Sequence, residues 1–228
     1  STADQFDSLG ARNLNQVSRN DVRDLSWSTS GKLITSLASR GHAITSGYEY
    51  EAVRRDIVGT TFVNDVQQLG DIGTNFFTST KRLALYAQDD WDISPEFAAN
   101  LGIRFEEIRT KTRDAAVESE NISRVTTPLG HLVWRFAAPS RDQVRLSLTQ
   151  SYRPPNTDQL TTRPSINSLY PATGGNLFSA ADSVGNSRLK PERANGIDLA
   201  FERYLKSAGV LSVNFFVRDI KDVIRNIT

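Results

Sequence analysis

The sequence predicts an all-β protein, an antiparallel up-and-down transmembrane β-barrel of which this chain is an incomplete segment. Three observations support the prediction. Apolar and polar residues alternate with period two in several runs, tight turns separate these runs in pairs, and no apolar run is long enough for a transmembrane helix. Because half of each barrel strand faces a polar lumen, a mean hydropathy of −0.40 is compatible with a membrane location.

The hairpin from Lys81 to Glu107 shows the alternation most clearly. Its second run places five apolar residues on one face: Phe97, Ala99, Leu101, Ile103 and Phe105. Charged residues and a glycine lie on the opposite face, and Ile93-Ser94-Pro95-Glu96 supplies the turn. An apolar face backed by a polar face suits a wall between hydrocarbon and water. A strand of a soluble sandwich alternates as well, so the hairpin alone does not decide between the two.

The same pattern predicts eight strands in four hairpins. The strands are Leu25–Leu37, Ala43–Val53, the two runs between Lys81 and Glu107, Thr126–Ala138, Gln143–Tyr152, Arg193–Leu205 and Val210–Asp219. We expect an irregular start, Ser1–Asp24, and three long connections, Arg54–Thr80, Ile108–Val125 and Arg153–Pro191. Short and long connections then alternate, which places every tight turn on one side of the membrane. A Greek-key sandwich distributes its long connections over both ends.

The polar faces of these strands carry charged residues. The set comprises Glu49, Glu51, Arg104, Glu106, Arg135, Arg145, Asp198 and Glu202. A closed barrel of eight strands has a lumen only wide enough for side chains, so eight charges inside it need dense pairing. An open wall of eight strands leaves two edges without hydrogen-bond partners in lipid. We therefore expect a segment of a larger barrel, with the small closed barrel as the alternative.

Composition limits the function. The chain has 228 residues and a net charge of +1, with its basic residues scattered, so we expect no nucleic-acid partner. It contains no cysteine, which excludes disulfides and thiolate metal sites. His42 and His131 have no nucleophile or acid at catalytic spacing, so we expect neither enzyme activity nor a cofactor or metal centre.

The long connection from Arg153 to Arg188 is the best candidate for ligand binding. A connection of this length usually either has a function or is disordered. Its residues that suit an anionic or aromatic chelate are Arg153, Asn156, Arg163, Tyr170 and Phe178. The alternative is a connection without ligand contact.

Four stretches, in this order along the chain, resemble the barrel of TonB-dependent outer-membrane receptors. They are LALYAQDDW (Leu83–Trp91) with LGIRF (Leu101–Phe105), SYRPPN (Ser151–Asn156), LKPE (Leu189–Glu192) with IDLAFE (Ile197–Glu202), and FFVRDIKDVI (Phe215–Ile224). The resemblance is greatest to the ferric-siderophore and colicin receptors. It implies a barrel of about 22 strands with a plugged lumen, which imports a scarce nutrient such as a ferric siderophore.

The resemblance also implies partners and boundaries. We expect outer-membrane lipid around the barrel, a small-molecule ligand outside it, and the TonB complex acting through a plug region. We expect residues 1–228 to be an internal part of the barrel without plug, TonB-contacting segment or closing strand, since Asp222–Thr228 lacks the aromatic end of such a strand. Seven of the charged residues are then candidates for contact with the plug: Glu49, Glu51, Arg104, Glu106, Arg145, Asp198 and Glu202. Two other functions stay open, a small barrel that anchors or adheres and a soluble β-sandwich that binds glycans.

Overall fold

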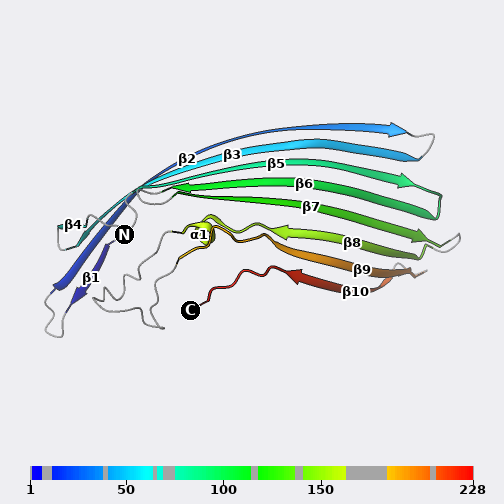
Figure 1. The fold of residues 1–228 in the computed structure, drawn as a ribbon. Coiled ribbons are helices and arrows are strands. Elements are labelled where there is room, and N and C mark those ends of the chain that lie inside the picture. The colour runs from blue at the N-terminus through cyan, green and yellow to red at the C-terminus, as the bar shows by residue number, and fades with distance from the viewer. Residues whose placement is uncertain are drawn as a thin grey trace.

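A computed structural model describes residues 2–6, 12–37, 41–63, 66–68, 75–113, 118–136, 141–162, 184–205 and 209–227. These residues form one antiparallel sheet in which the strands follow chain order, with β4 paired to β3 at the side (Figure 1). The strands are β1 (Thr2–Phe6), β2 (Arg12–Leu37), β3 (His42–Val63), β4 (Val66–Gln68), β5 (Asn75–Asp92), β6 (Phe97–Arg113), β7 (Glu118–Arg135), β8 (Gln143–Arg153), β9 (Glu192–Tyr204) and β10 (Val210–Lys221). Helix α1 (Thr157–Leu160) follows β8.

The predicted hairpin between Lys81 and Glu107 is confirmed as β5 and β6. Leu85 lies opposite Phe105, so the apolar faces of the two strands coincide. In the turn, the hydroxyl oxygen of Ser94 accepts a hydrogen bond of 3.1 Å from the backbone N–H of Phe97. The other predicted hairpins are also present, as β2 with β3, β7 with β8, and β9 with β10.

The predicted irregular start, Ser1–Asp24, and two of the predicted long connections, Arg54–Thr80 and Ile108–Val125, are wrong. Strands β1 and β2 occupy most of the start, and β3, β4 and β5 occupy much of the first connection. Most of the second connection belongs to strands, because β6 continues to Arg113 and β7 begins at Glu118. The predicted alternation of short and long connections therefore fails there, whereas the up-and-down order of the strands is confirmed.

Where β6 ends and β7 begins, the missed strand residues are polar on both faces. Near the ends of β6 and β7, Lys111 lies opposite Glu120 on one face and Thr110 opposite Asn121 on the other. Outside the hydrocarbon layer neither face needs apolar side chains, so the period-two hydrophobic pattern ends although the strand continues. The sequence pattern therefore predicts a connection where the structure has a polar strand.

The apolar face of the sheet is exposed. Ile103 and Leu101 are each 53% exposed, and the most deeply buried side chains, such as Val125 and Glu106, lie on the polar face. No second sheet covers the apolar face within the described ranges. The soluble β-sandwich alternative is therefore wrong. Among the described residues no helix has the length and apolar character needed to cross a membrane.

Aromatic side chains mark two levels on the apolar face. Near the tight turns, Trp91 stacks on His42 with ring centroids 4.9 Å apart. Further along the strands, Trp27 packs against Tyr50 with ring centroids 5.0 Å apart. The eight residue steps from His42 to Tyr50 correspond to about 26 Å of strand, or about 20 Å of height at the usual tilt. This height is close to the height of the apolar band of an outer-membrane barrel. Strands such as β2 and β3 are much longer, so they continue well beyond this band.

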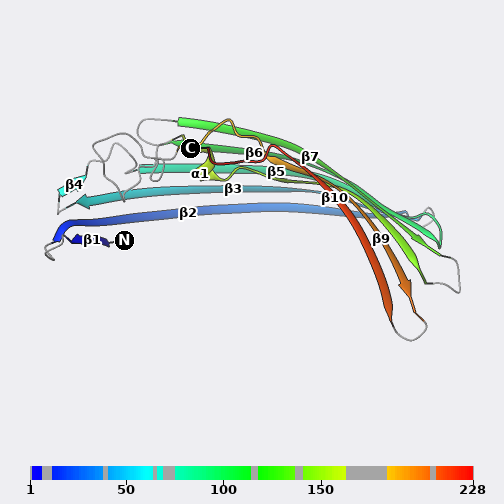
Figure 2. The same ribbon diagram turned by 90° about the horizontal axis from the view of Figure 1, so that it is seen from below.

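The sheet is open. Its strand order runs from β1 to β10, and these two border strands do not pair with each other in the described residues. All residues of β10 are exposed. Figure 2 shows the common bend of the strands from below. The small closed barrel is therefore wrong for the described part, and the prediction of an incomplete barrel wall is confirmed.

Candidate functional site

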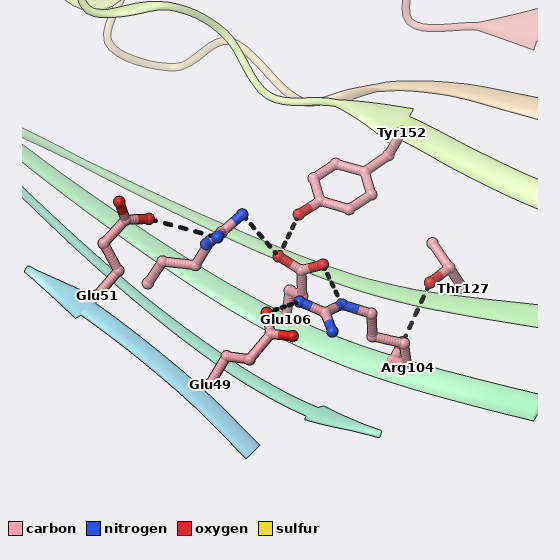
Figure 3. A network of polar contacts seen from close by, with 7 residues as sticks. Glu49, Glu51, Arg104, Glu106, Thr127 and Tyr152 are labelled. Atoms are coloured by element: carbon pink, nitrogen blue, oxygen red, sulfur yellow. Dashed lines mark hydrogen bonds and ion pairs between the residues drawn. The ribbon is translucent and has the colours of Figure 1, made fainter. Parts of the chain in front are cut away.

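Charged side chains from three neighbouring strands meet on the polar face (Figure 3). Alternation places Glu49 and Glu51 of β3, Arg82 of β5, and Arg104 and Glu106 of β6 on this face. The register sets Glu51 directly opposite Arg82. We call these five residues the polar-face cluster.

Arg104 lies at the centre of the polar-face cluster. Its Nη2 is 2.7 Å from Glu49 Oε2, and its Nε is 2.6 Å from Glu106 Oε1. Its guanidinium carbon lies 5.7 Å from the centre of the Tyr86 ring. Tyr86 in turn covers Gly47, where an added Cβ would lie 2.6 Å from the tyrosine hydroxyl oxygen. Glycine is therefore required at position 47 for Tyr86 to lie flat and support Arg104.

Glu106 is the buried carboxylate of the cluster. Its side chain is only 7% exposed. Besides Arg104, it accepts a hydrogen bond of 2.5 Å from the Tyr152 hydroxyl, and Arg82 Nη1 lies 3.9 Å away. A buried charge is tolerated when it is paired and hydrogen-bonded in this way. The two hydrogen bonds and the ion pair with Arg82 fix the position of the Glu106 side chain.

The cluster contains three carboxylates and two guanidinium groups, so it has a net negative charge. The Glu49 and Glu51 side chains are 41% and 44% exposed, although each contacts an arginine. Their open sides can accept a further cation, such as a lysine or arginine side chain. In the described part of the chain, no group of three or more His, Cys, Asp or Glu side chains is arranged to hold a metal ion.

The other three predicted plug-contact residues, Arg145, Asp198 and Glu202, lie apart from the cluster. Arg145 of β8 forms an ion pair with Glu202 of β9. Asp198 is 2.8 Å from Nη2 of Arg218 on β10, a partner that the sequence analysis missed. The structure thus places all seven predicted plug-contact residues on the polar face but brings only four of them together.

The two ends of the connection between β8 and β9 are held by contacts within the chain. Arg153 lies opposite Glu192 and its Nε is 3.1 Å from Glu192 Oε2. Asn156 caps α1, since its Oδ1 accepts a hydrogen bond of 2.8 Å from the backbone N–H of Gln159. Arg153 and Asn156 therefore have structural roles, and their contact with a ligand stays a prediction. The other three ligand candidates, Arg163, Tyr170 and Phe178, lie outside the described residues.

Tyr152 is a polar-face residue that alternation does not predict. Strict period two puts it on the apolar face with Leu146 and Leu148. The pairing of β7 with β8 ends at Leu129 and Thr149, however, and the residue that precedes Leu129 in β7 is Pro128, which has no N–H to donate. Beyond this point β8 is paired only with β9 and is free to turn its tyrosine toward Glu106. Pro128 lies inside a predicted strand, and it is the feature of the sequence that could have indicated this interruption of the pairing.

Comparison with known proteins supports the fold described above. A family model described as "TonB dependent receptor-like, beta-barrel" matches residues 1–228. No curated protein is similar enough in sequence to be matched with the chain.

Several solved structures are similar in fold. The ferric-catecholate import receptor Fiu of E. coli K12 is 16% identical, with a TM-score of 0.55 over 90% of this chain. The alcaligin outer-membrane receptor FauA of Bordetella pertussis is 16% identical, with a TM-score of 0.53 over 94%. The ferric citrate transporter FecA is 14% identical, with a TM-score of 0.59 over 96%. The chain covers 32%, 32% and 30% of these structures, respectively.

Proposed function

The chain belongs to the TonB-dependent receptor-like β-barrel family, and on this premise we propose that it is part of the wall of a receptor that imports a scarce nutrient. It is a bacterial outer-membrane protein, as members of this family are. Since it covers about a third of the receptors compared with it, import is an activity of a larger barrel.

One observation carries the proposal: an open sheet with an exposed apolar face has a net negative cluster on its polar face. In a barrel the apolar face contacts lipid, and the polar face lines the lumen. Glu49 and Glu51 stay about two-fifths exposed and the sheet does not close on itself. Both features suit a wide lumen that holds another part of the receptor.

The occupant that we propose for this lumen is a plug. A lysine or arginine of the plug fits the open sides of Glu49 and Glu51, because it would balance the charge of the cluster. Arg145, Asp198 and Glu202 are further contact candidates, already paired within the sheet. The TonB complex would act on the receptor through the plug.

The proposed cargo is a ferric siderophore. The solved structures that support this choice include receptors named for ferric catecholates, alcaligin and ferric citrate. The connection between β8 and β9 is the proposed contact of the chain with this cargo, because it is the longest connection of the sheet.

The test is uptake of radioactive iron by cells that depend on the full-length receptor. A panel of ferric chelates is supplied, and we expect energy-dependent uptake of at least one of them. The double variant Glu49→Gln and Glu51→Gln should lower this uptake about tenfold by removing the charge that holds the plug in register. Glu120→Gln, on the apolar side beyond the membrane level, is the control and should leave uptake unchanged. Absence of uptake of every chelate would contradict the proposed cargo, and normal uptake by the double variant would contradict the plug contact.

A further inference from the structure

Tyr152 connects two parts of the molecule that serve different steps of import. We propose that Tyr152 is a positioning residue, which couples the polar-face cluster to the base of the connection between β8 and β9. By this base we mean residues 154–161 and 184–191. The state of the cluster then sets how firmly the base is held. The inference rests on the proposed function in one respect, since it takes the polar face to line the lumen.

The contact of Tyr152 with the cluster is short and shielded. Its hydroxyl donates a hydrogen bond of 2.5 Å to Glu106 Oε2, and the Glu106 side chain is 7% exposed. A hydrogen bond to an ionised carboxylate is stronger than one between neutral groups. The backbone pairing of β7 with β8 ends at Thr149. Beyond it, the contact of Tyr152 with Glu106 links the last residues of β8 to β6.

On its other side, Tyr152 is joined to the base by a stiff path. Pro154 and Pro155 follow Arg153 directly and restrict the backbone before α1 begins. The two limbs of the base are then joined to each other. The backbone N–H of Gly185 donates a hydrogen bond of 2.8 Å to Thr161 O, and that of Asn186 donates one of 2.7 Å to Gln159 O.

The base is also anchored to β7. Asn121 Nδ2 lies 2.7 Å from Ser187 O and 3.0 Å from Leu189 O. Leu160 at the end of α1 is 3% exposed, so the helix is packed rather than free in solvent. Among the described residues, the base is therefore one packed unit with two side-chain hydrogen-bonded links to the wall, from Asn121 on β7 and from Tyr152 to Glu106 on β6. Of these two links, that of Tyr152 involves a charged group, the Glu106 carboxylate.

Glu106 lets the cluster influence this link. It shares Arg104 with Glu49, whose side chain is 41% exposed. A cationic group that binds Glu49 competes with Arg104, and Arg104 then interacts more closely with Glu106. A carboxylate that is more fully neutralised attracts the Tyr152 hydroxyl less, so the base loosens. By linkage, a ligand that tightens the base weakens the binding of that cation to the same extent.

The experiment measures amide hydrogen exchange in the full-length receptor, without ligand. Tyr152→Phe removes only the hydroxyl, and we expect exchange across Gln159–Thr161 and Gly185–Asn186 to become about tenfold faster. Tyr204→Phe is the matched control. It removes a tyrosine hydroxyl that donates to Glu202 at 3.2 Å, at the opposite end of β9, and should leave these amides unchanged.

Coupling is tested by combining variants. Glu49→Gln frees Arg104 for Glu106 and should also speed exchange at the base, but it should add nothing in the Tyr152→Phe background. Unchanged exchange in Tyr152→Phe, or additive effects in the double variant, would overturn the proposal. If Tyr152→Phe does not fold, Glu106→Gln takes its place in the same comparison. Because exchange is measured without cargo, its outcome is independent of the iron-uptake test.

Discussion

Neighbouring residues of β6 face opposite environments. Ile103 is 53% exposed on the apolar face, whereas Arg104 lies in the polar-face cluster. Ile103 also lies opposite Ala87, which lies opposite Ser46, midway between the aromatic levels of His42 and Tyr50. Alternation along a strand thus assigns each residue to lipid or lumen, and the register assigns its depth.

Ile103→Arg places a charge in the middle of the apolar band. We expect it to cost about 2 to 4 kcal/mol of the free energy of folding into lipid. The control is Asn100→Arg on the polar face, where the new guanidinium lies near Asp90 and should be tolerated. The measurement is equilibrium unfolding of the full-length receptor in lipid vesicles. Equal costs for the two substitutions would contradict the assignment of the faces.

Asp24 gives a prediction for pH. It lies beyond the aromatic level of Trp27 and Tyr50. Its carboxylate accepts hydrogen bonds of 2.7 and 2.8 Å from Arg55, which lower the pKa of Asp24 below the ordinary value of 3.8 despite some desolvation. The pair therefore stabilises the extended hairpin above that pH, and the contribution is lost as the pH falls through the lowered pKa. A carboxyl NMR titration should show a lower midpoint in the wild type than in Arg55→Gln. The same midpoint in both would show that the pair has no effect.

Residue placement was predictable where the strand ladder is intact. The period of two correctly predicts Glu49, Arg104 and Glu106 on one face, because the continuous pairing of β3 with β5 and of β5 with β6 keeps these strands in register. It failed for Tyr152, because Pro128 ends the pairing that would have enforced it. Side-chain contacts between distant strands, such as Tyr152 with Glu106, depend on this local departure and cannot be read from periodicity.

The strands are longer than a membrane crossing requires. Strand β2 has 26 residues, which is about 85 Å of extended chain. The sequence predicted only the part inside the apolar band, since hydrophobic alternation ends where the lipid ends. A strand outside the membrane is specified by its pairing with neighbours rather than by its own pattern, so its length was not predictable.

The end of β10 is held by a glutamate of the LKPE motif. Asp222 adopts a φ of 56°, which turns the chain after β10, and the backbone N–H of Ile224 then donates a hydrogen bond of 2.8 Å to Glu192 Oε1. The other carboxylate oxygen of Glu192 contacts Arg153 at 3.1 Å. One side chain thus joins the ends of β8, β9 and β10, which gives this motif a structural role.

Glu192→Ala should release these strand ends. We expect the segment around Ile224 to lose about 1 to 3 kcal/mol of local stability, because a charged acceptor of its N–H is removed. Amide exchange of Ile224 measures this loss directly. Glu192→Gln keeps an acceptor oxygen and should lose less. If Glu192→Ala leaves the exchange of Ile224 unchanged, the motif has no such role.

The whole sheet is amphipathic and open, and both properties suit a segment of a larger barrel. Its apolar face suits lipid, and unpaired edge strands cannot exist in lipid without partners. The up-and-down order, the two faces and the open borders were predicted from the sequence, because each follows from alternation and from the charge on the polar face. The packed base between β8 and β9 was not predicted, because it depends on contacts such as that of Asn121 with Ser187.

The most direct test of the account is a scan of β6 by site-directed spin labelling. The chain contains no cysteine, so single cysteines can be introduced from Asn100 to Phe105 in a full-length receptor freed of any others. We expect oxygen, which partitions into lipid, to reach labels at the odd positions, Leu101, Ile103 and Phe105. A water-soluble nickel chelate should be less excluded at the even positions. Accessibility without this alternation, or with the two faces exchanged, would contradict the assignment of lipid and lumen on which the proposed function depends.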